Sequence, residues 1–379
     1  MSSFLKLGCT EVVQQVLVKQ GIIDPTEIQQ QAIPLVAAGQ DVIGQAPTGT
    51  GKTLAYVLPL LQKLQQGKLP NEVIIIAPTY ELAAQIHGVA STLIKAAALS
   101  ITTALIVGSG NIARQMDKLK SKPQLIVGSS GRIVELIKKK KIHAPSMRTL
   151  VIDEADRLFS DEQLTSVKEL VKSTLKDRQI LCFSATFSVK TLNIAKEIMQ
   201  NPVVVRTTTR PTIPSSVKHF YFIAERRDKF EILRKLIGLI QPQQALVFVN
   251  SGESMADVTA KLCYHGFKAA GLHGGNGKQD RKQTVQDVLK GKTNILVASD
   301  IAARGLDFPD LTHVFQLDFP ETPHAYLHRA GRTGRAGKVG VVISIVTARE
   351  VVELHKAASA LSVSFTEKKL LKGKIVDLH

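Results

Sequence analysis

A glycine-rich loop in the first part of the chain has the composition of a phosphate-binding site. The residues Ala46-Pro-Thr-Gly-Thr-Gly-Lys-Thr53 follow a short apolar run and open a helical pattern. Glycines in such a turn let backbone N–H groups approach phosphate oxygens, and the N-terminus of the following helix favours negative charge. A lysine at its end reaches the β- and γ-phosphates, and the next hydroxyl ligates Mg²⁺. The predicted nucleotide-binding residues are Ala46, Pro47, Thr48, Gly49, Thr50, Gly51, Lys52 and Thr53.

A second chemical group is a run of carboxylates further along the chain. The apolar run at 150–152 ends in Asp153, Glu154 and Asp156. Strand ends in an open α/β sheet lie at the ligand crevice, where one carboxylate can hold Mg²⁺ and its neighbour can activate a water. We therefore predict Thr53 and Asp153 as metal ligands and Glu154 as the residue that activates water. In isolation such a cluster is commonly a helix cap, but the phosphate loop upstream favours hydrolysis of a nucleotide.

The elements that position these groups alternate between strands and helices. Short runs such as 73–77 and 179–183 are apolar at nearly every position, which is typical of parallel strands covered on both faces. Helical patterns such as 52–64 and 81–97 lie between these runs. The alternation predicts an α/β fold with doubly wound, mostly parallel sheets.

A polar, proline-bearing stretch near residue 207 interrupts this alternation, and a second strand–helix series follows it. We therefore expect two domains joined by a linker. The predicted division is an N-terminal segment at 1–30, a first domain at 31–206, a linker at 207–216 and a second domain at 217–379.

Taken together, the motifs resemble those of the DEAD-box helicases of superfamily 2, and the resemblance covers essentially the whole chain. The family takes its name from the sequence found here at 153–156, Asp-Glu-Ala-Asp. The resemblance implies two tandem RecA-like domains, each a mostly parallel sheet with helices on both faces. It also implies an ATP-dependent RNA helicase that uses Mg²⁺ and is stimulated by RNA, with its active site in the cleft between the domains.

The segment 21–29, Gly-Ile-Ile-Asp-Pro-Thr-Glu-Ile-Gln, resembles the family motif that reads adenine. A side-chain amide donates and accepts together, which matches the N6/N7 edge of adenine. The resemblance thus assigns ATP selection to Gln29. In the second domain, it adds Gly305 and Asp307 to the nucleotide site, with Asp307 at the ribose.

Arginines in the motif at 328–335 resemble the arginine fingers of the family. Arg332 and Arg335 would stabilise charge that develops on the γ-phosphoryl oxygens. Because the fingers and the phosphate loop lie on different domains, hydrolysis would require the domains to close. The catalytic set is therefore Lys52, Asp153, Glu154, Arg332 and Arg335, and the set that couples hydrolysis to strand separation is Asp156, Ser184, Thr186, His328 and Arg329.

Family contacts to RNA go mainly to the sugar–phosphate backbone. Several positions depart from the family pattern: Tyr80 replaces an arginine, Ser130 a proline and Lys278 a glutamine, while Ser129 and Ser299 keep a hydroxyl in place of threonine. These changes would affect RNA affinity or coupling more than ATP hydrolysis, and surface-loop roles stay open for the individual positions. The predicted RNA-binding residues are Pro78, Thr79, Glu81, Gly108, Gly131, Arg132, Asn250, Gly274, Arg281 and Ser299.

The composition fits a soluble protein with a polyanionic partner. The 379 residues carry 49 Lys+Arg against 32 Asp+Glu, a formal net charge of +17, which favours RNA but also suits a basic surface kept for solubility. The three cysteines lack metal-ligand spacing, and no apolar run approaches the roughly 20 residues of a membrane span. We expect a cytoplasmic monomer with no membrane partner.

Three alternatives to an RNA helicase remain from the sequence. An ATP-gated RNA clamp would bind or remodel ribonucleoprotein with little unwinding, and a DNA helicase of the same superfamily would be stimulated by DNA. An inactive scaffold is disfavoured by the intact Lys52, Glu154 and Arg335. The compact core favours a bacterial enzyme, whereas the RNA substrate and the pathway stay open.

Overall fold

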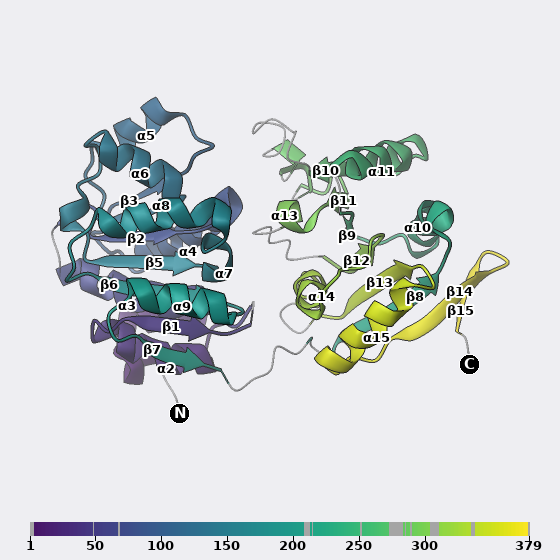
Figure 1. Cartoon of the computed structure of the whole chain (residues 1–379), viewed down its shortest axis with the longest axis horizontal. Coiled ribbons are helices and arrows are strands. Elements are labelled where there is room, and N and C mark those ends of the chain that lie inside the picture. The colour runs from purple at the N-terminus through teal and green to yellow at the C-terminus, as the bar shows by residue number, and fades with distance from the viewer. Residues whose placement is uncertain are drawn as a thin grey trace. The chain divides into compact units, whose positions relative to one another are not determined.

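The computed structural model describes residues 4–47, 49–66, 69–207, 213, 215–250, 252–272, 283–284, 286–288, 290–303, 311–334 and 338–377. The chain divides into two compact units, unit 1 at Met1–Arg210 and unit 2 at Pro211–His379. The division falls within the predicted linker at 207–216, although the exact domain limits stay a prediction. Figure 1 shows the elements of both units.

Unit 1 is built around a parallel sheet. The described residues form seven strands in the order β3-β4-β2-β5-β6-β1-β7, and every strand pair is parallel. In chain order the elements are η1 (Phe4–Leu7), α1 (Glu11–Lys19), α2 (Glu27–Ala37), β1 (Val42–Gln45), α3 (Lys52–Gln66), β2 (Val73–Ile76), α4 (Tyr80–Ala96), β3 (Thr103–Ile106), α5 (Ile112–Leu119), β4 (Leu125–Gly128), α6 (Ser130–Lys138), η2 (Ala144–Ser146), β5 (Thr149–Asp153), α7 (Ala155–Leu158), α8 (Asp161–Lys172), β6 (Gln179–Ser184), α9 (Val189–Ile198) and β7 (Val203–Arg206).

Unit 2 is also built around a mostly parallel sheet, but one edge of this sheet is an antiparallel hairpin. Its described strands follow the order β10-β11-β9-β12-β13-β8-β14-β15, parallel except for the antiparallel pair β14–β15. The elements are β8 (Val217–Ile223), η3 (Arg226–Asp228), α10 (Lys229–Ile240), β9 (Ala245–Phe248), α11 (Gly252–Tyr264), β10 (Ala269–Leu272), β11 (Ile295–Ala298), α13 (Asp300–Ala303), β12 (His313–Gln316), α14 (Pro323–Ala330), β13 (Gly340–Val346), α15 (Glu350–Leu361), β14 (Thr366–Leu371) and β15 (Lys374–Asp377).

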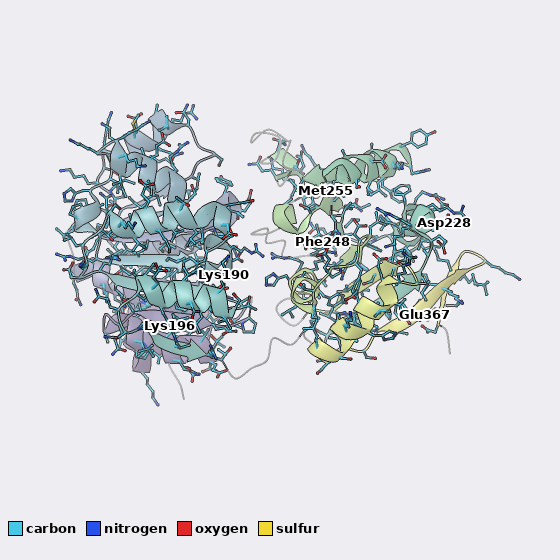
Figure 2. The ribbon with its side chains drawn as sticks, viewed as in Figure 1. Lys190, Lys196, Asp228, Phe248, Met255 and Glu367 are labelled. Carbon is cyan, nitrogen blue, oxygen red and sulfur yellow. The ribbon has the colours of Figure 1, made fainter. Side chains whose placement is uncertain are left out.

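Burial on both faces explains why the strands read as continuous apolar runs. Neighbouring residues of one strand enter different cores: Val42 belongs to one cluster of unit 1 and Ile43 to the other. The same split separates Leu246 from Val247 in unit 2. Phe248, labelled in Figure 2, ends β9 and is buried. The predicted doubly wound α/β class is confirmed.

The C-terminal hairpin β14–β15 is not predicted by the sequence patterns. Four lysines between 368 and 374 interrupt the apolar alternation that would mark its strands. The hairpin forms because Leu371 pairs with Lys374 across a two-residue turn, in which Lys372 and Gly373 both have positive φ. Such a turn suits the twist of a hairpin. Among the described residues, no helix combines the length and hydropathy needed to cross a bilayer.

Candidate functional site

The carboxyl ends of the unit 1 strands carry the predicted site residues, and the strand order sorts them into two groups. The phosphate loop, the acidic run and the Ser184 segment follow β1, β5 and β6, which are neighbours in the sheet. The predicted RNA-binding residues of this unit follow β2, β3 and β4, which form the other half of the same edge. Parallel strands present their carboxyl ends at one edge, so the fold brings each group together.

The phosphate loop connects β1 to α3 and is held by its own hydrogen bonds. Gly49 and Gly51 adopt φ values of +86° and +83°, which favour glycine. The Lys52 ammonium donates to the Ala46 and Pro47 carbonyls at 2.7 and 2.9 Å. Thr50 Oγ1 also donates to the Pro47 carbonyl at 2.7 Å. Burial lowers the pKa of Lys52, and the neighbouring carboxylates Asp153, Glu154 and Asp156 oppose that shift.

The predicted adenine-reading segment is hydrogen-bonded to the phosphate loop. Thr26 Oγ1 donates to the Thr50 carbonyl at 2.7 Å, and Gln29 Nε2 donates to the Gly51 carbonyl at 3.1 Å. Gln29 Oε1 accepts from the Thr26 N–H at 2.9 Å as part of a capping box that starts α2. Gln29 is 1% exposed. The sequence does not predict Thr26 as a partner of the loop, although its position at a helix start is a visible signal.

The carboxylates of the acidic run lie where β5 ends. Asp153 is buried, and its Oδ1 accepts from the Glu154 N–H at 3.0 Å. Glu154 has a φ of +51° and forms an ion pair with Arg157 at 3.1 Å. A non-glycine residue in this left-handed region costs free energy of order 1 kcal/mol, and such costs concentrate at functional sites. The backbone thus turns sharply at the residue predicted to activate water.

A tyrosine that the sequence does not reveal holds the acidic run to the loop helix. Tyr56 lies one turn after Lys52 on α3 and is fully buried. Its hydroxyl donates to Asp153 Oδ2 at 2.9 Å and also hydrogen bonds the Thr53 side chain. Burial, followed by the negative charge of Asp153, raises the pKa of Tyr56 well above its usual value. The spacing from Lys52 is the one signal that could have identified this residue.

The residues present suit a divalent cation. Tyr56 brings together the Thr53 hydroxyl and the Asp153 carboxylate, both hard oxygen donors of the kind that Mg²⁺ prefers. Burial raises the pKa of Asp153 to about 6, against the opposing charge of Lys52. A buried carboxylate whose desolvation exceeds its compensation by protein partners is a favourable site for a metal ion.

The Ser184 segment contacts the acidic run directly. Ser184 Oγ donates to Asp156 Oδ1 at 2.7 Å, and the Thr186 N–H donates to Ser184 Oγ at 3.3 Å. Ser184 is fully buried at the end of β6. Two of the residues predicted to couple hydrolysis to strand separation, Asp156 and Ser184, are therefore adjacent in the fold.

Two of the predicted RNA-binding residues of unit 1, Gly108 and Arg132, are hydrogen-bonded to each other at their half of the edge. Arg132 on α6 donates to the carbonyls of Gly108 and Gly110 at 2.8 and 3.1 Å. The Gly108 N–H donates to Ser129 Oγ at 3.0 Å. Gly131 lies between these residues at the start of α6, and Pro78, Thr79 and Glu81 lie where β2 gives way to α4.

At position 130, the family that the sequence resembles has a proline, whereas this chain has a serine whose hydroxyl hydrogen bonds a neighbouring helix. Ser130 Oγ shares a 2.6 Å hydrogen bond with Ser166 of α8. At the start of α4, the Thr79 hydroxyl accepts from the Leu82 N–H at 3.3 Å, and Tyr80 is 41% exposed. The hydroxyl at position 130 thus provides a tether between two helices.

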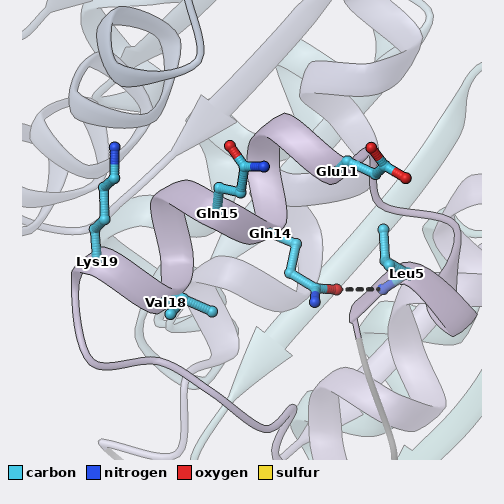
Figure 3. Close-up of a pocket in the computed structure, with 6 residues that line it drawn as sticks. All are labelled: Leu5, Glu11, Gln14, Gln15, Val18 and Lys19. Carbon is cyan, nitrogen blue, oxygen red and sulfur yellow. Dashed lines mark hydrogen bonds between the residues drawn. The ribbon is translucent and has the colours of Figure 1, made fainter.

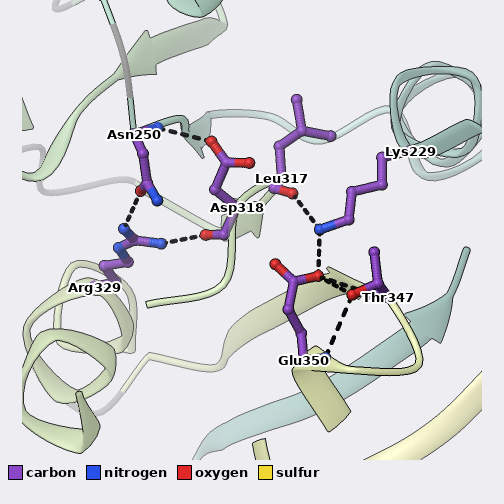
Figure 4. Close-up of polar contacts among 7 residues, drawn as sticks. All are labelled: Lys229, Asn250, Leu317, Asp318, Arg329, Thr347 and Glu350. Carbon is purple, nitrogen blue, oxygen red and sulfur yellow. Dashed lines mark hydrogen bonds and ion pairs between the residues drawn. The ribbon is translucent and has the colours of Figure 1, made fainter. Parts of the chain in front are cut away.

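In unit 2, a buried arginine hydrogen bonds three residues, each of which follows a different strand. Arg329 on α14 is 1% exposed and makes a bidentate pair with Asp300 at 2.8 and 2.6 Å. It also donates to Asn250 Oδ1 at 3.0 Å and to the Asp318 carbonyl at 2.5 Å. The Asn250 N–H donates to Asp318 Oδ2 at 2.8 Å (Figure 4). The Arg329 guanidinium lies 4.8 Å from the Phe248 ring centroid.

This network joins predicted RNA-binding and coupling residues within unit 2. Asn250 follows β9, Asp300 follows β11 next to Ser299, and Arg329 precedes Arg332 by three residues. Asp318 is a partner that the sequence does not reveal. Beside it, the buried Lys229 donates to the Leu317 carbonyl and to Glu350 (Figure 4). The predicted residues Thr48, Gly274, Arg281, Gly305, Asp307 and Arg335, and the variant position Lys278, lie outside the described residues.

Two pockets lie away from these residues. One, of about 420 Å³, is lined by Leu5, Glu11, Gln14, Gln15, Val18 and Lys19 on η1 and α1 (Figure 3). The other, of about 470 Å³, includes Asp41, Lys63, Glu72, Arg148 and Arg178 at the opposite, amino end of the sheet strands. Neither contains a residue of the phosphate loop or the acidic run.

Comparisons with known proteins agree with this geometry. The family model for DEAD/DEAH box helicases matches residues 26–194, and the model for the helicase conserved C-terminal domain matches residues 228–337. The chain is 42% identical to DEAD-box ATP-dependent RNA helicase CshC of Bacillus cereus, over 96% of this chain and 93% of that protein. It is 40% identical to probable ATP-dependent RNA helicase YfmL of Bacillus subtilis, over 94% and 93%.

Among solved structures, the chain is similar to S. cerevisiae Dbp5 bound to RNA and ADP BeF3. The TM-score is 0.86 at 28% sequence identity, and the match covers 97% of this chain and 95% of that chain.

Proposed function

The chain belongs to the family of DEAD-box ATP-dependent RNA helicases, and we propose from that premise how its residues divide the work. The protein is an ATP-hydrolysing RNA helicase that locally separates short RNA duplexes or remodels ribonucleoprotein. The observation that supports the assignment of roles is the proximity of Lys52 to Asp153 and Glu154 at one edge of the sheet, with Tyr56 on α3 hydrogen-bonded to Asp153.

In our proposal, ATP binds along the phosphate loop. The Lys52 ammonium exchanges its two loop carbonyls for β- and γ-phosphate oxygens, which are stronger, charged acceptors. Backbone N–H groups at Gly49 to Thr53 meet the remaining oxygens at the start of α3. Gln29 reads the adenine edge, so its hydrogen bond to the Gly51 carbonyl connects base recognition with the loop conformation.

Mg²⁺ would be held by Thr53 and Asp153 and would neutralise charge on the phosphates. Tyr56 orients both ligands, because its hydroxyl hydrogen bonds each of them. Glu154 orients the attacking water and takes up its proton. Its backbone is fixed at the turn after β5, and Arg157 restrains its carboxylate.

RNA would bind along the β2, β3 and β4 ends of unit 1 and at Asn250, Gly274, Arg281 and Ser299 of unit 2. Binding of ATP and RNA would draw the units together and bring Arg332 and Arg335 to the γ-phosphate. The Arg329 network supports this proposal, because it connects Asn250, a predicted RNA contact, to the helix that precedes Arg332. Closure on single-stranded RNA would exclude a straight duplex and separate its strands locally.

The test is ATPase turnover with and without single-stranded RNA, alongside matched single-stranded DNA and strand displacement on a short duplex. We expect stimulation by RNA and not by DNA. Glu154→Gln should reduce turnover by roughly 10²- to 10⁴-fold, the usual contribution of a positioned base, while it still binds ATP. Turnover that is independent of RNA, or equal in the Glu154→Gln variant, would contradict the assignment.

An ATP-gated RNA clamp with little unwinding is the second candidate, and Tyr80 favours it. The family's arginine at this position is replaced by an exposed neutral side chain at the start of α4, which removes a charged donor near the RNA-binding residues. RNA binding that depends on ATP, without strand displacement, would identify the clamp. We further propose that the protein is a cytoplasmic monomer.

A further inference from the structure

An exposed aromatic strip lies on unit 2, away from the residues assigned above. Tyr264, the last residue of α11, is 87% exposed, the highest exposure among the large apolar and aromatic side chains of the described residues. Its ring meets His265 edge to face at 5.4 Å, and His265 lies 6.3 Å from Phe230 on α10. The Lys261 ammonium stands 5.5 Å from the Phe230 ring centroid. We call Phe230, Lys261, Tyr264 and His265 the aromatic strip.

The two segments that carry the strip, 226–231 and 257–268, contain more basic than acidic side chains. Lys261 pairs with Asp257 at 2.8 Å, and Arg227 lies 3.8 Å from Asp228. Arg226 and Lys268 are exposed and form no ion pair with any described residue. The strip therefore combines ring faces with cations, which is the combination that binds single-stranded nucleic acid without sequence preference.

The strip suits bases better than a folded protein partner. Protein docking usually needs a contiguous apolar patch of a few hundred Å². The other exposed apolar side chains of unit 2 are spread over separate elements: Ile223, Leu239, Val339, Val352, Leu371 and Ile375. A base, in contrast, needs one accessible ring face and a nearby cation, and Tyr264 with its neighbours offers both.

We propose that the aromatic strip is an accessory site on which an unpaired base of single-stranded RNA stacks against Tyr264. The proposal rests on the proposed function, since it assumes RNA as the substrate. Helix α11 starts just after Asn250 and spans 13 residues, so Tyr264 lies about 20 Å along it from the predicted RNA contact. The strip would therefore hold a segment of RNA that extends beyond the clamp, and a short RNA confined to the clamp would not reach it.

The first test compares Tyr264→Ala with Tyr264→Phe, which keeps the ring. We expect Tyr264→Ala to weaken the binding of a long single strand by roughly 5- to 150-fold, the range for one stacked base. Tyr264→Phe should match the wild type, and a short strand should bind all three proteins equally. Because Tyr264 is exposed, neither change should alter folding or ATPase turnover at saturating RNA. Equal binding of the long strand by Tyr264→Ala and wild type would overturn the proposal.

The second test uses the absence of tryptophan from the sequence. Tyr264→Trp places a unique fluorophore on the strip, and Val352→Trp provides a control on α15, where Val352 is 57% exposed. Titration with single-stranded poly(A) should quench the first tryptophan and leave the second unchanged, and duplex RNA should quench neither. Unchanged fluorescence of Tyr264→Trp while poly(A) stimulates its ATPase would overturn the strip alone. Absence of RNA stimulation in the wild type would instead overturn the proposed function.

Discussion

At the scale of single residues, the site depends on how the buried carboxylate of Asp153 is kept in its ionised form. Asp153 loses hydration at the end of β5, and its pKa rises to about 6 because burial outweighs the charge of Lys52. Tyr56 and the Glu154 N–H supply hydrogen bonds that favour the ionised form. Tyr56 on α3 is thus the residue that connects the two predicted metal ligands, because it contacts both Asp153 and Thr53.

Removing the Tyr56 hydroxyl tests this position. Tyr56→Phe keeps the ring, which packs 5.2 Å from Phe183, and deletes the hydrogen bond to Asp153. We expect the Mg²⁺ concentration that gives half-maximal ATPase to rise roughly 10- to 100-fold, as for other partners of metal ligands. Magnesium titrations of ATPase would measure it. Tyr80→Phe, which removes an exposed hydroxyl from the same unit, should leave the magnesium dependence unchanged, and an equal response of both variants would refute the role of Tyr56.

At the scale of elements, the strand order decides which loops meet. The order β3-β4-β2-β5-β6-β1-β7 places β6 beside β1 and β5 next to β6, so segments far apart in sequence converge near the phosphate loop. Helix α2 then approaches the loop closely enough that Thr26 and Gln29 bond its carbonyls. The segment predicted to read adenine therefore also stabilises the phosphate loop, through these two hydrogen bonds.

The contact between α2 and the loop depends on the absence of a side chain at Gly51. A Cβ atom there would lie 2.2 Å from Gln29 Nε2, whereas a Cβ at Gly49 would meet nothing within 4 Å. Both glycines have positive φ, so Gly51→Ala and Gly49→Ala carry a similar backbone cost, and only the first displaces Gln29. We expect Gly51→Ala to bind ATP about tenfold more weakly than Gly49→Ala, which corresponds to the loss of about one hydrogen bond. Calorimetric titration with ATP would measure the difference, and equal affinities would exclude a role for the Gln29 contact.

At the scale of the whole molecule, the two units share a layout but differ in what they bury. Unit 2 encloses His219 on β8, which is 6% exposed and bonds the Tyr326 hydroxyl of α14 at 2.7 Å. Phe365 packs against the same imidazole, with ring centroids 5.6 Å apart. Burial lowers the pKa of His219 to about 4 from its usual 6.5.

This shift predicts acid sensitivity of unit 2. Between pH 6.5 and about 4 the unfolded chain binds a proton at His219 that the folded unit does not, so the free energy of unfolding falls as pH decreases. Above pH 6.5, His219 does not reduce the free energy of unfolding. Near pH 4, at the acid end of the window, the reduction approaches about 3 kcal/mol. Urea unfolding followed by circular dichroism at several pH values would measure it. His219→Gln, which cannot gain the proton, should flatten the dependence; an unchanged slope would show that other groups cause it.

The sequence by itself determined the chemistry of the site and the class of the fold. The glycine spacing before Lys52, the carboxylates at 153–156 and the apolar strand runs are local patterns, because phosphate binding, helix starts and two-sided burial each depend on residues close in sequence. Tertiary structure alone decided the contacts that depend on strand order and on crossings between distant segments. Tyr56 against Asp153, Thr26 against Thr50, and Arg329 against Asn250 and Asp318 each join residues whose proximity is set by packing, which no local spacing encodes.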